Sequence, residues 1–312
     1  MVSREWMVTH EWMVKPTAQT EWIERRGILV WFAEVFNSIG AGLFIVSLIY
    51  NNLYGMLIGW LIIVFLKLLP HLIYLGKPLR FWLMLPPFSN AWKTSWVSRG
   101  IIFTTLFCGF AFMLFLLTYF YPGTGWVIAL KFLSGIMAFL TGIYSGFALS
   151  YCRSVPFWNS ALLPLLFLFT GIADGFAFIV AISLFDTQVN AMTAEVGSQI
   201  TLIVNIIIIV SYLWNATCAS KTAKNSAMLL LRGSLALHFW VGVIVCGIVI
   251  PLAVSIYNLL NGEIAIPLLI IGVAFHTIGT FSLKYCLLKA GLHNPLLPVT
   301  TSNYLKAIKK GG

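Results

Sequence analysis

The chain has 312 residues, of which 60% are hydrophobic and 9% are charged, and its formal net charge is +10. Its mean hydropathy of +0.94 excludes a soluble globular protein and predicts an all-α polytopic membrane protein. Because the basic residues gather in short segments between apolar runs, they are typical of topology signals, and we expect no nucleic-acid partner. The five cysteines form no CxxC pair, so the sequence predicts no zinc or iron–sulfur site.

Residues 1–27 are polar and rich in tryptophan, with EWMV at 5–8 and again at 11–14, and EWIE at 21–24. Alternating acidic and indole side chains favour a segment that lies along lipid headgroups or against a partner protein. The segment lacks a short apolar core followed by a small-residue cleavage site, so we do not expect a signal peptide.

Eight apolar runs follow, each long enough to cross about 30 Å of hydrocarbon as a helix. We expect these spans near 28–50, 53–75, 98–121, 125–150, 160–184, 190–214, 227–258 and 264–288. An even number of spans puts both termini on the same side of the membrane.

Basic residues gather on the side of the termini, whereas the short loops on the opposite side contain no lysine or arginine. The basic residues on the terminus side are Arg4, Lys15, Arg25, Arg26, Lys77, Arg80, Lys93, Arg99, Arg153, Lys221, Lys224, Lys289, Lys306, Lys309 and Lys310. The positive-inside rule therefore predicts a multi-pass protein of the cytoplasmic membrane with both termini in the cytoplasm.

The longest connection, from Gly76 to Arg99, contains three tryptophans and a Pro-Pro pair among basic residues. Such a composition predicts either an amphipathic piece anchored in the membrane interface or a docking surface for another subunit.

Polar side chains recur at similar depth in three of the expected spans. Glu34 and Asn37 share a face of the first span, Lys67 and His71 share a face of the second, and Tyr144 lies near the end of the fourth. Counting 1.5 Å per residue from the terminus side brings these groups to a common depth. Convergent polar groups beside an apolar groove suit a quinone headgroup. A structural ion pair of Glu34 and a satisfied, buried His71 remain the alternatives.

Ionisable residues also occur in the later spans, where each is costly and therefore a functional candidate. The proton-relay candidates are Asp174, Arg232, His238 and Lys67. Asp174 is expected near mid-membrane on the fifth span, with Glu195 at the far end of the sixth. The same residues are also compatible with internal pairs that hold helices together, including a pair of Glu34 with Lys67 or Arg232.

Three motifs carry a resemblance: SIGAGLF at 38–44, YLGKPLRFW at 74–82 and YSGFALSYCRSVPFWNSALLPLLFLFTG at 144–171. In this order they resemble the NrfD/PsrC family of polysulfide reductase membrane subunits. The resemblance implies an eight-helix subunit, arranged as two four-helix bundles, that binds menaquinone or another exchangeable quinone. It also implies electron exchange with a four-cluster iron–sulfur subunit that serves a molybdopterin-type catalytic subunit, with no haem or iron–sulfur cluster in this chain.

The resemblance also suggests a division of the chain and one site residue. The expected parts are 1–27, an N-terminal docking segment; 28–150, a first bundle with the quinone site; 151–290, a second bundle; and 291–312, a basic tail. Tyr144 matches the family tyrosine that contacts quinone. The family histidine of the first helix falls near Glu34, and the family acid of the second helix falls at Gly76. We therefore hypothesise that Glu34 and His71 have exchanged roles.

Two other classes of protein remain open. A b-type cytochrome would need transmembrane histidines at matched depth, for which His238 and His276 are the candidates. A secondary transporter would be indicated by inverted repeats with broken helices at the membrane midplane, and the sequence has no such repeat.

Overall fold

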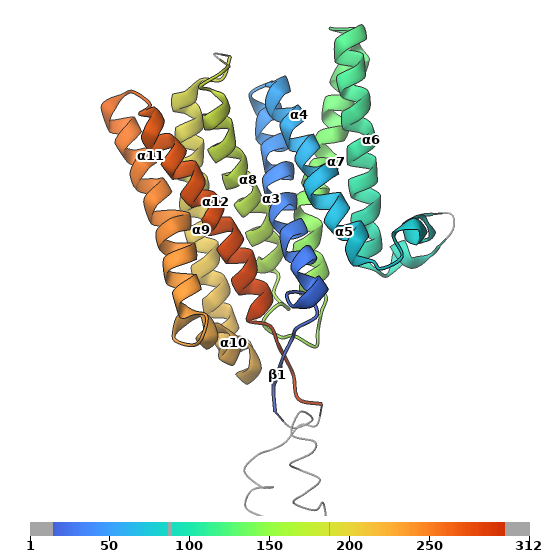
Figure 1. Ribbon diagram of the computed structural model, residues 1–312, viewed down its shortest axis with the longest axis vertical. Coiled ribbons are helices and arrows are strands. Elements are labelled where there is room, and N and C mark those ends of the chain that lie inside the picture. The colour runs from blue at the N-terminus through green and yellow to red at the C-terminus, as the bar shows by residue number, and fades with distance from the viewer. Residues whose placement is uncertain (1–14, 87–88, 187, 297–312) are drawn as a thin grey trace, which may run out of the picture.

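The computed structural model describes residues 15–86, 89–186 and 188–296, and these are helical almost throughout (Figure 1). Within these residues, eight helical segments are long and apolar enough to cross a membrane. They are Arg25–Ile49, Leu53–Tyr74, Trp96–Phe120, Gly125–Ser150, Leu162–Ile182, Ala191–Ala219, His238–Asn261 and Ile266–Lys289. The predicted all-α polytopic membrane fold with eight spans is confirmed.

Most spans are single α-helices, and two contain a wider π-helical segment. The single helices are α3 (Ile28–Ile49), which follows the short 3₁₀ turn η1 (Arg25–Gly27), α6 (Trp96–Phe120), α7 (Gly125–Ser150), α8 (Leu162–Ile182), α9 (Ala191–Ala219) and α12 (Ile266–Lys289). The second span consists of α4 (Leu53–Leu61), the π-helical η2 (Ile62–Leu68) and α5 (Leu69–Tyr74). The seventh consists of the π-helical η5 (His238–Val249) and α11 (Ile250–Asn261).

Each π-helical segment ends two residues before a proline in the sequence. Pro70 follows η2 at the start of α5, and Pro251 follows η5 at the start of α11. A proline inside a helix lacks a backbone N–H and its ring clashes with the carbonyl four residues earlier. A widened turn is one way in which a spanning helix accommodates such a residue, and π-helical turns are frequent at functional sites.

The spans form two groups that meet along α3 and α8 (Figure 1). In the first group α3 packs against the second span and α7, and α6 packs against α7. In the second group α8 packs against α9 and α12, and α12 packs against η5 and α11. Glycines bring α3 and α8 together, because a Cβ atom on Gly42 would lie 1.6 Å from the carbonyl oxygen of Gly171.

The two described ends of the chain pair with each other. Strand β1 (Thr17–Ala18) pairs antiparallel with β2 (Leu292–His293), and the buried Gln19 donates from its backbone N–H to the carbonyl of Gly291 at 2.9 Å. These segments therefore lie at the same end of the helix bundle (Figure 1). The Glu–Trp repeats at 5–8 and 11–14 and the lysines after residue 305 lie outside the described residues.

The predicted seventh span, 227–258, is wrong at its start. Residues Lys221–Leu231 form a separate helix, α10, which ends at Arg232, and the span itself begins at His238. The apolar residues AMLLL at the end of α10 were predicted as part of the next span because of their hydropathy. In the structure Gly233 and Ser234 separate the two helices. Arg232 and His238 consequently lie before and at the start of the seventh span, and both side chains are exposed.

The connection from Gly76 to Arg99 projects sideways from the terminus-side end of the bundle (Figure 1). It contains two short 3₁₀ helices, η3 (Pro78–Met84) and η4 (Ala91–Lys93), and exposes the side chains of Leu79, Trp82 and Trp92. The Arg99 guanidinium lies 4.6 Å from the ring centroid of Trp96 and fixes the end of the loop by donating to two of its backbone carbonyls. A docking role for this surface stays a prediction.

Candidate functional site

The predicted polar cluster of the first group is assembled from three spans, and Tyr144 lies at its centre. Tyr144 on α7 is buried, and the ammonium of Lys67 on η2 lies 5.1 Å from its ring centroid. The same ammonium donates to Oγ1 of Thr104 on α6 at 2.6 Å. Since Thr104 Oγ1 donates in turn to the carbonyl of Gly100 at 2.8 Å, Lys67 is held in one position beside the tyrosine ring.

Glu34 and Asn37 face this cluster from α3, and both are buried. Asn37 Nδ2 donates to the carbonyl of Thr141 at 2.9 Å and to Oγ of Ser145 at 3.4 Å. Glu34 lies within hydrogen-bonding reach of Ser145 and interacts electrostatically with Lys67. The structure therefore brings Glu34, Asn37 and Lys67 together around Tyr144, as the sequence predicted.

Two acceptors in this cluster have no partner among the described residues. They are Oε2 of Glu34 and Oδ1 of Asn37, which are both buried and lie three residues apart on α3. A buried polar atom without a hydrogen bond costs free energy comparable to a lost bond, so such atoms mark the place of a missing donor. The pair is suited to a ligand that carries hydroxyl groups.

His71 lies on the terminus side of the same cluster. It follows Lys67 by one helical turn on α5, interacts electrostatically with it, and is half-buried. Its Nδ1 is buried and has no hydrogen-bond partner in the described part of the chain. His71 therefore lies between the Lys67 ammonium and the terminus-side surface, at the edge of the cluster.

A second polar cluster lies in the other helix group around Asp174 on α8. Thr280 on α12 donates to Oδ1 of Asp174 at 2.5 Å, and Nε2 of His276 lies 3.0 Å from the same oxygen. The His276 contact has the distance of an ion pair but not the geometry of a hydrogen bond. His276 Nδ1 lies 3.3 Å from the carbonyl of Gly247 in the π-helical segment η5.

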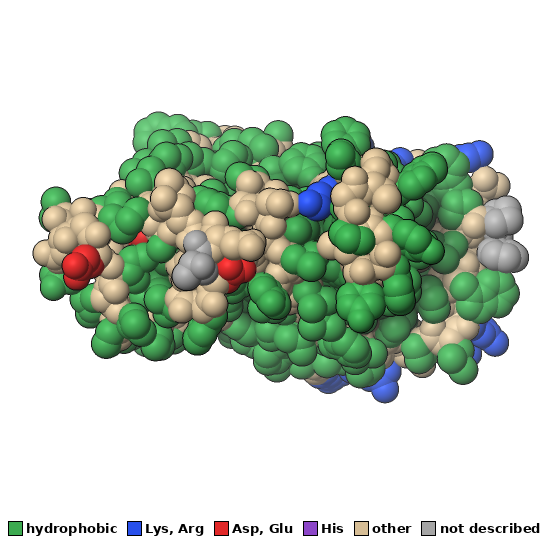
Figure 2. Space-filling model, turned by 90° about the horizontal axis from the view of Figure 1, so that it is seen from above, with side chains coloured by type: hydrophobic (Ala, Val, Ile, Leu, Met, Phe, Trp, Pro, Cys, Tyr) green, Lys and Arg blue, Asp and Glu red, His purple; other side chains and the backbone are tan. Residues whose placement is uncertain are grey.

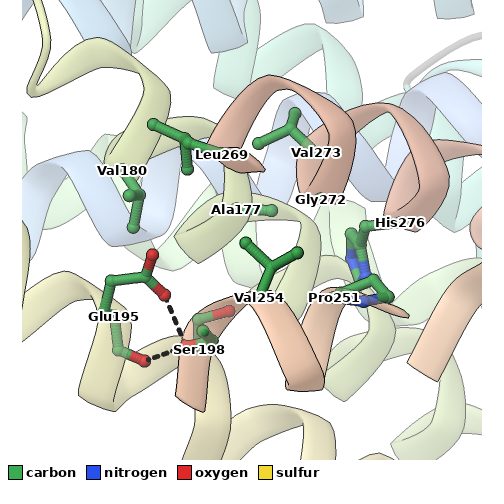
Figure 3. Close-up of a pocket in the computed structure, with 11 residues that line it drawn as sticks. Ala177, Val180, Glu195, Ser198, Pro251, Val254, Leu269, Gly272, Val273 and His276 are labelled. Carbon is green, nitrogen blue, oxygen red and sulfur yellow. Dashed lines mark hydrogen bonds between the residues drawn. The ribbon is translucent and has the colours of Figure 1, made fainter. Parts of the chain in front are cut away.

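Two small cavities border His276, one on each side. One is lined on α8 and α9 by Thr170 and Asn205, and the other extends towards Glu195. Each has a volume of about 20 Å³, which is enough for one water molecule. Figure 3 shows Glu195 and His276 at opposite ends of the second cavity.

Glu195 is buried on α9 and is fully engaged by the seventh span. Its carboxylate accepts hydrogen bonds from Ser255 Oγ at 2.5 Å and from Asn258 Nδ2 at 2.9 Å. Because Asn258 Oδ1 also accepts from the backbone of Ala265, this network ties three segments together at the end of the bundle far from the termini.

The structure separates the proton-relay candidates. Lys67 belongs to the first cluster and Asp174 to the second. Arg232 and His238 are exposed, and neither contacts Asp174 in the described part of the chain. Among the described residues Glu34 forms no ion pair with Arg232, whereas its electrostatic interaction with Lys67 is present.

The histidine pair expected for a b-type cytochrome is also excluded. His238 is the first residue of its span, whereas His276 lies thirteen residues before the end of α12. Since both positions count from the terminus side, the two side chains differ in depth by roughly 20 Å at 1.5 Å per residue. They cannot ligate one haem iron from opposite faces.

Sequence reasoning missed Lys284, Thr104 and Ser145. Lys284 is 1% exposed, which is an extreme degree of burial for an ammonium group. A lysine inside the predicted eighth span, 264–288, was the available signal. The hydroxyl groups of Thr104 and Ser145 could not be singled out in the sequence, since serine and threonine are common in membrane helices.

A profile of the family described as polysulphide reductase, NrfD, matches residues 26–295, which is most of the chain. The chain belongs to the NrfD family. This confirms the resemblance carried by the three motifs.

Individual NrfD-family relatives match over shorter stretches. The chain is 26% identical to protein NrfD of Escherichia coli over 162 residues, and 31% identical to the NrfD homolog of Haemophilus influenzae over 166, in both cases half of each protein. It is 28% identical to the C subunit of the polysulfide reductase of Wolinella succinogenes over 133 residues, 41% of this protein and 42% of the relative. The matches thus span about half the length of these curated relatives or less.

Proposed function

We propose that this NrfD-family chain is the membrane subunit of a respiratory oxidoreductase complex and binds a quinol or quinone, such as menaquinone, at the cluster around Tyr144. The observation that carries the proposal is a pair of buried acceptors, Glu34 Oε2 and Asn37 Oδ1, that have no partner among the described residues and lie beside a tyrosine and a fixed ammonium. A quinol headgroup carries two hydroxyl donors, and the oxidised headgroup carries two acceptors. Tyr144 and Lys67 supply donors where Glu34 and Asn37 supply acceptors.

The depth of the cluster fits an exchange of electrons and protons near the terminus-side surface. Tyr144, Lys67 and Glu34 lie six, seven and nine residues from the terminus-side ends of their spans, or roughly 9–14 Å at 1.5 Å per residue. Oxidation of the quinol releases two electrons and two protons. The carboxylate of Glu34 is placed to accept a proton, and His71 lies between the cluster and the surface to pass it on.

The electron partner in this proposal is a four-cluster iron–sulfur subunit that serves a molybdopterin-type catalytic subunit. The support is family membership, since one relative is named as the C subunit of a polysulfide reductase. The exposed indoles of the Gly76–Arg99 loop lie at the same end of the bundle as the Tyr144 cluster, where a docked cluster would be near the headgroup.

The proposal also includes a proton relay through the second helix group. His276, which contacts Asp174, borders two cavities of water size, and Glu195 lines one of them. Groups of this kind separated by single waters are suited to proton transfer across a membrane.

The test is binding of a fluorescent quinone-site inhibitor to the purified chain in lipid vesicles. We expect saturable quenching with the wild-type chain and its loss in a Glu34→Gln, Asn37→Leu double variant, which removes the amide acceptor and replaces the anionic carboxylate by a neutral, weaker acceptor. Glu195→Gln is the matched control, because it alters an equally buried carboxylate at the other end of the bundle. An absence of binding to the wild-type chain, or undiminished binding to the double variant, would contradict the proposal.

A further inference from the structure

Helix α10 (Lys221–Leu231) lies at the terminus-side end of the second helix group and has one buried and one exposed face (Figure 1). The exposed face carries Lys221 and Lys224, and the exposed Arg232 follows the last turn. At 3.6 residues per turn these three positions fall on one side of the helix. The opposite side is buried against the bundle and consists of Thr222, Ala223, Ser226, Ala227 and Leu230.

The three basic side chains of α10 have no counter-ion in the described part of the chain. The ion pairs found there join His276 to Asp174 and Lys289 to Glu24. No hydrogen bond to another described residue engages the side chains of Lys221, Lys224 or Arg232 either. The outer face of α10 therefore presents uncompensated positive charge, which is complementary to an anionic group.

Both ends of α10 are joined closely to the ends of membrane spans. Ser220 alone separates α10 from α9, and its hydroxyl oxygen caps α10 by accepting from the backbone N–H of Ala223 at 3.1 Å. At the other end, the indole Nε1 of Trp240 donates to the carbonyl of Leu231 at 3.1 Å. Since Trp240 is in the first turn of the seventh span, Arg232 lies at the level where that span begins.

Apolar side chains are exposed directly after the basic residues in the sequence. Leu237 is 70% exposed and Trp240 is 49% exposed, at the start of the seventh span. Exposed side chains at this position of a span contact lipid, and tryptophan prefers the depth of the headgroups. Cations at the membrane surface next to lipid-facing apolar groups match the two parts of a phospholipid.

We propose that the outer face of α10 and the start of the seventh span bind an anionic phospholipid. Lys224 and Arg232 contact the phosphate and the anionic headgroup, and the acyl chains lie along Leu237 and Trp240. A guanidinium can hold two phosphate oxygens at once, whereas an ammonium acts as a point charge. Basic segments beside a membrane span attract anionic headgroups in the same way.

The lipid site is separate from the proposed quinone site and does not depend on it. α10 contacts α9, η5 and strand β2, whereas Tyr144 and its neighbours belong to the first helix group. An acidic surface of a partner protein would also complement the three cations. The exposed Leu237 and Trp240 favour lipid, because they adjoin or belong to a membrane-spanning segment.

The test is native mass spectrometry of the full chain in detergent, titrated with phosphatidylglycerol or with phosphatidylcholine of the same acyl chains. We expect the first phosphatidylglycerol to bind at least about ten-fold more tightly, because the choline group compensates the phosphate charge. Removing one basic residue beside an anionic headgroup weakens binding about five-fold. The Lys224→Gln, Arg232→Gln double variant should therefore lose roughly 25-fold in affinity for phosphatidylglycerol and keep its affinity for phosphatidylcholine.

Two further variants serve as controls. Lys93→Gln with Arg153→Gln removes the same charge from exposed positions at the same end of the bundle and should bind phosphatidylglycerol like the wild-type chain. Lys224→Arg with Arg232→Lys keeps the charge of α10 and should retain the affinity. All four positions are exposed, and the melting temperature of each variant checks that the fold is retained.

Equal affinity of the wild-type chain for the two lipids overturns the inference, and so does an equal loss in the Lys93, Arg153 control. Displacement of the bound lipid by glycerol 3-phosphate at concentrations near the dissociation constant of the lipid also overturns it, since the site would then take a soluble phosphate. If the double variant keeps its lipid affinity but no longer assembles with other subunits in cells, the outer face of α10 binds protein instead of lipid. None of these measurements involves quinone, so they stand apart from the inhibitor-binding test.

Discussion

A Cβ atom on Gly100 would lie 2.2 Å from Cε2 of Tyr144. The tyrosine ring can therefore pack against α6 only because Gly100 has no side chain. The carbonyl of the same glycine accepts the hydrogen bond of Thr104, which in turn accepts from Lys67. One residue of α6 therefore positions both the ring and the ammonium beside it.

We expect Gly100→Ala to displace the Tyr144 ring and reduce quinol-dependent turnover of the complex while leaving artificial-donor activity intact. Adding one methyl group to a packed site costs about 1–3 kcal/mol, and here the group displaced is a proposed quinone ligand. Gly109→Ala on the same helix is the matched control, since a Cβ there meets no atom within 4 Å. Equal quinol turnover in the two variants would show that the ring position is unimportant.

Tyr144→Phe tests the phenol itself. The ring and its contact with Lys67 are retained, so assembly should be normal, whereas one hydrogen bond to the headgroup is lost. A single hydrogen bond contributes about 0.5–1.5 kcal/mol, so we expect the KM for quinol to rise several-fold. A further fall in kcat indicates that the phenol also guides a proton. Wild-type kinetics with quinol would remove Tyr144 from the site.

Glu34→Gln separates a proton acceptor from a structural charge. If Glu34 accepts quinol protons, the amide should lower kcat with quinol at all pH values and leave artificial-donor turnover unchanged. If the carboxylate only compensates Lys67 and Lys284, the loss should appear as reduced thermal stability of the assembled complex. Comparing kcat with the melting temperature of the same preparation distinguishes the two, and a stable variant with wild-type kcat contradicts the acceptor role.

The sequence predicted the spans and most of the first cluster because both depend on regular helix geometry. A rise of 1.5 Å per residue is enough to bring Glu34, Asn37 and Tyr144 to similar depth. The rotation of a helix about its own axis is harder to predict from sequence. A span that is apolar on all sides does not reveal which of its faces packs against which neighbouring helix. Lys284 was missed for this reason, since its burial depends on the orientation of α12.

The start of the seventh span was predicted wrongly because hydropathy alone does not separate a span from an adjoining apolar segment. Gly233 breaks the run, and the helix before it, α10, carries Lys221 and Lys224. The π-helical segments had a visible signal, since Pro70 and Pro251 lie inside apolar runs where a regular helix cannot continue.

The fourth prediction concerns a deletion in the N-terminal segment, and the structure indicates where that deletion should end. Removing residues 1–20 would also remove β1 and Gln19, which bind the chain after α12 and stabilise the fold. Deleting residues 1–14 leaves those contacts in place. We expect this shorter deletion to release the proposed iron–sulfur partner from membranes while the chain itself stays inserted. Gln19→Ala is the comparison for fold damage, and an intact complex after the deletion would contradict the docking role.

The orientation of the chain is the last prediction, and it follows from the distribution of charge between the two ends. The terminus-side end carries Arg25, Arg26 and the basic residues of the Gly76–Arg99 loop, whereas the opposite loops carry Asp186 and Glu263. Figure 2 shows the latter end, where acidic groups are visible and most visible basic groups lie at the edge.

Basic residues near span ends are retained on the cytoplasmic side, and acidic residues contribute little to orientation. Lys131 is an exception that lies within α7 and not in a loop, and its ammonium donates to Asn51 at the end opposite the termini. We therefore expect a fluorescent reporter fused after Gly312 to be active in the cytoplasm, and a phosphatase that needs the periplasm to be inactive at the same position. The converse should hold for both reporters when they replace Glu263 in the loop between the seventh and eighth spans. A phosphatase active only after Gly312 would reverse the orientation and place the proposed iron–sulfur partner outside the cytoplasm.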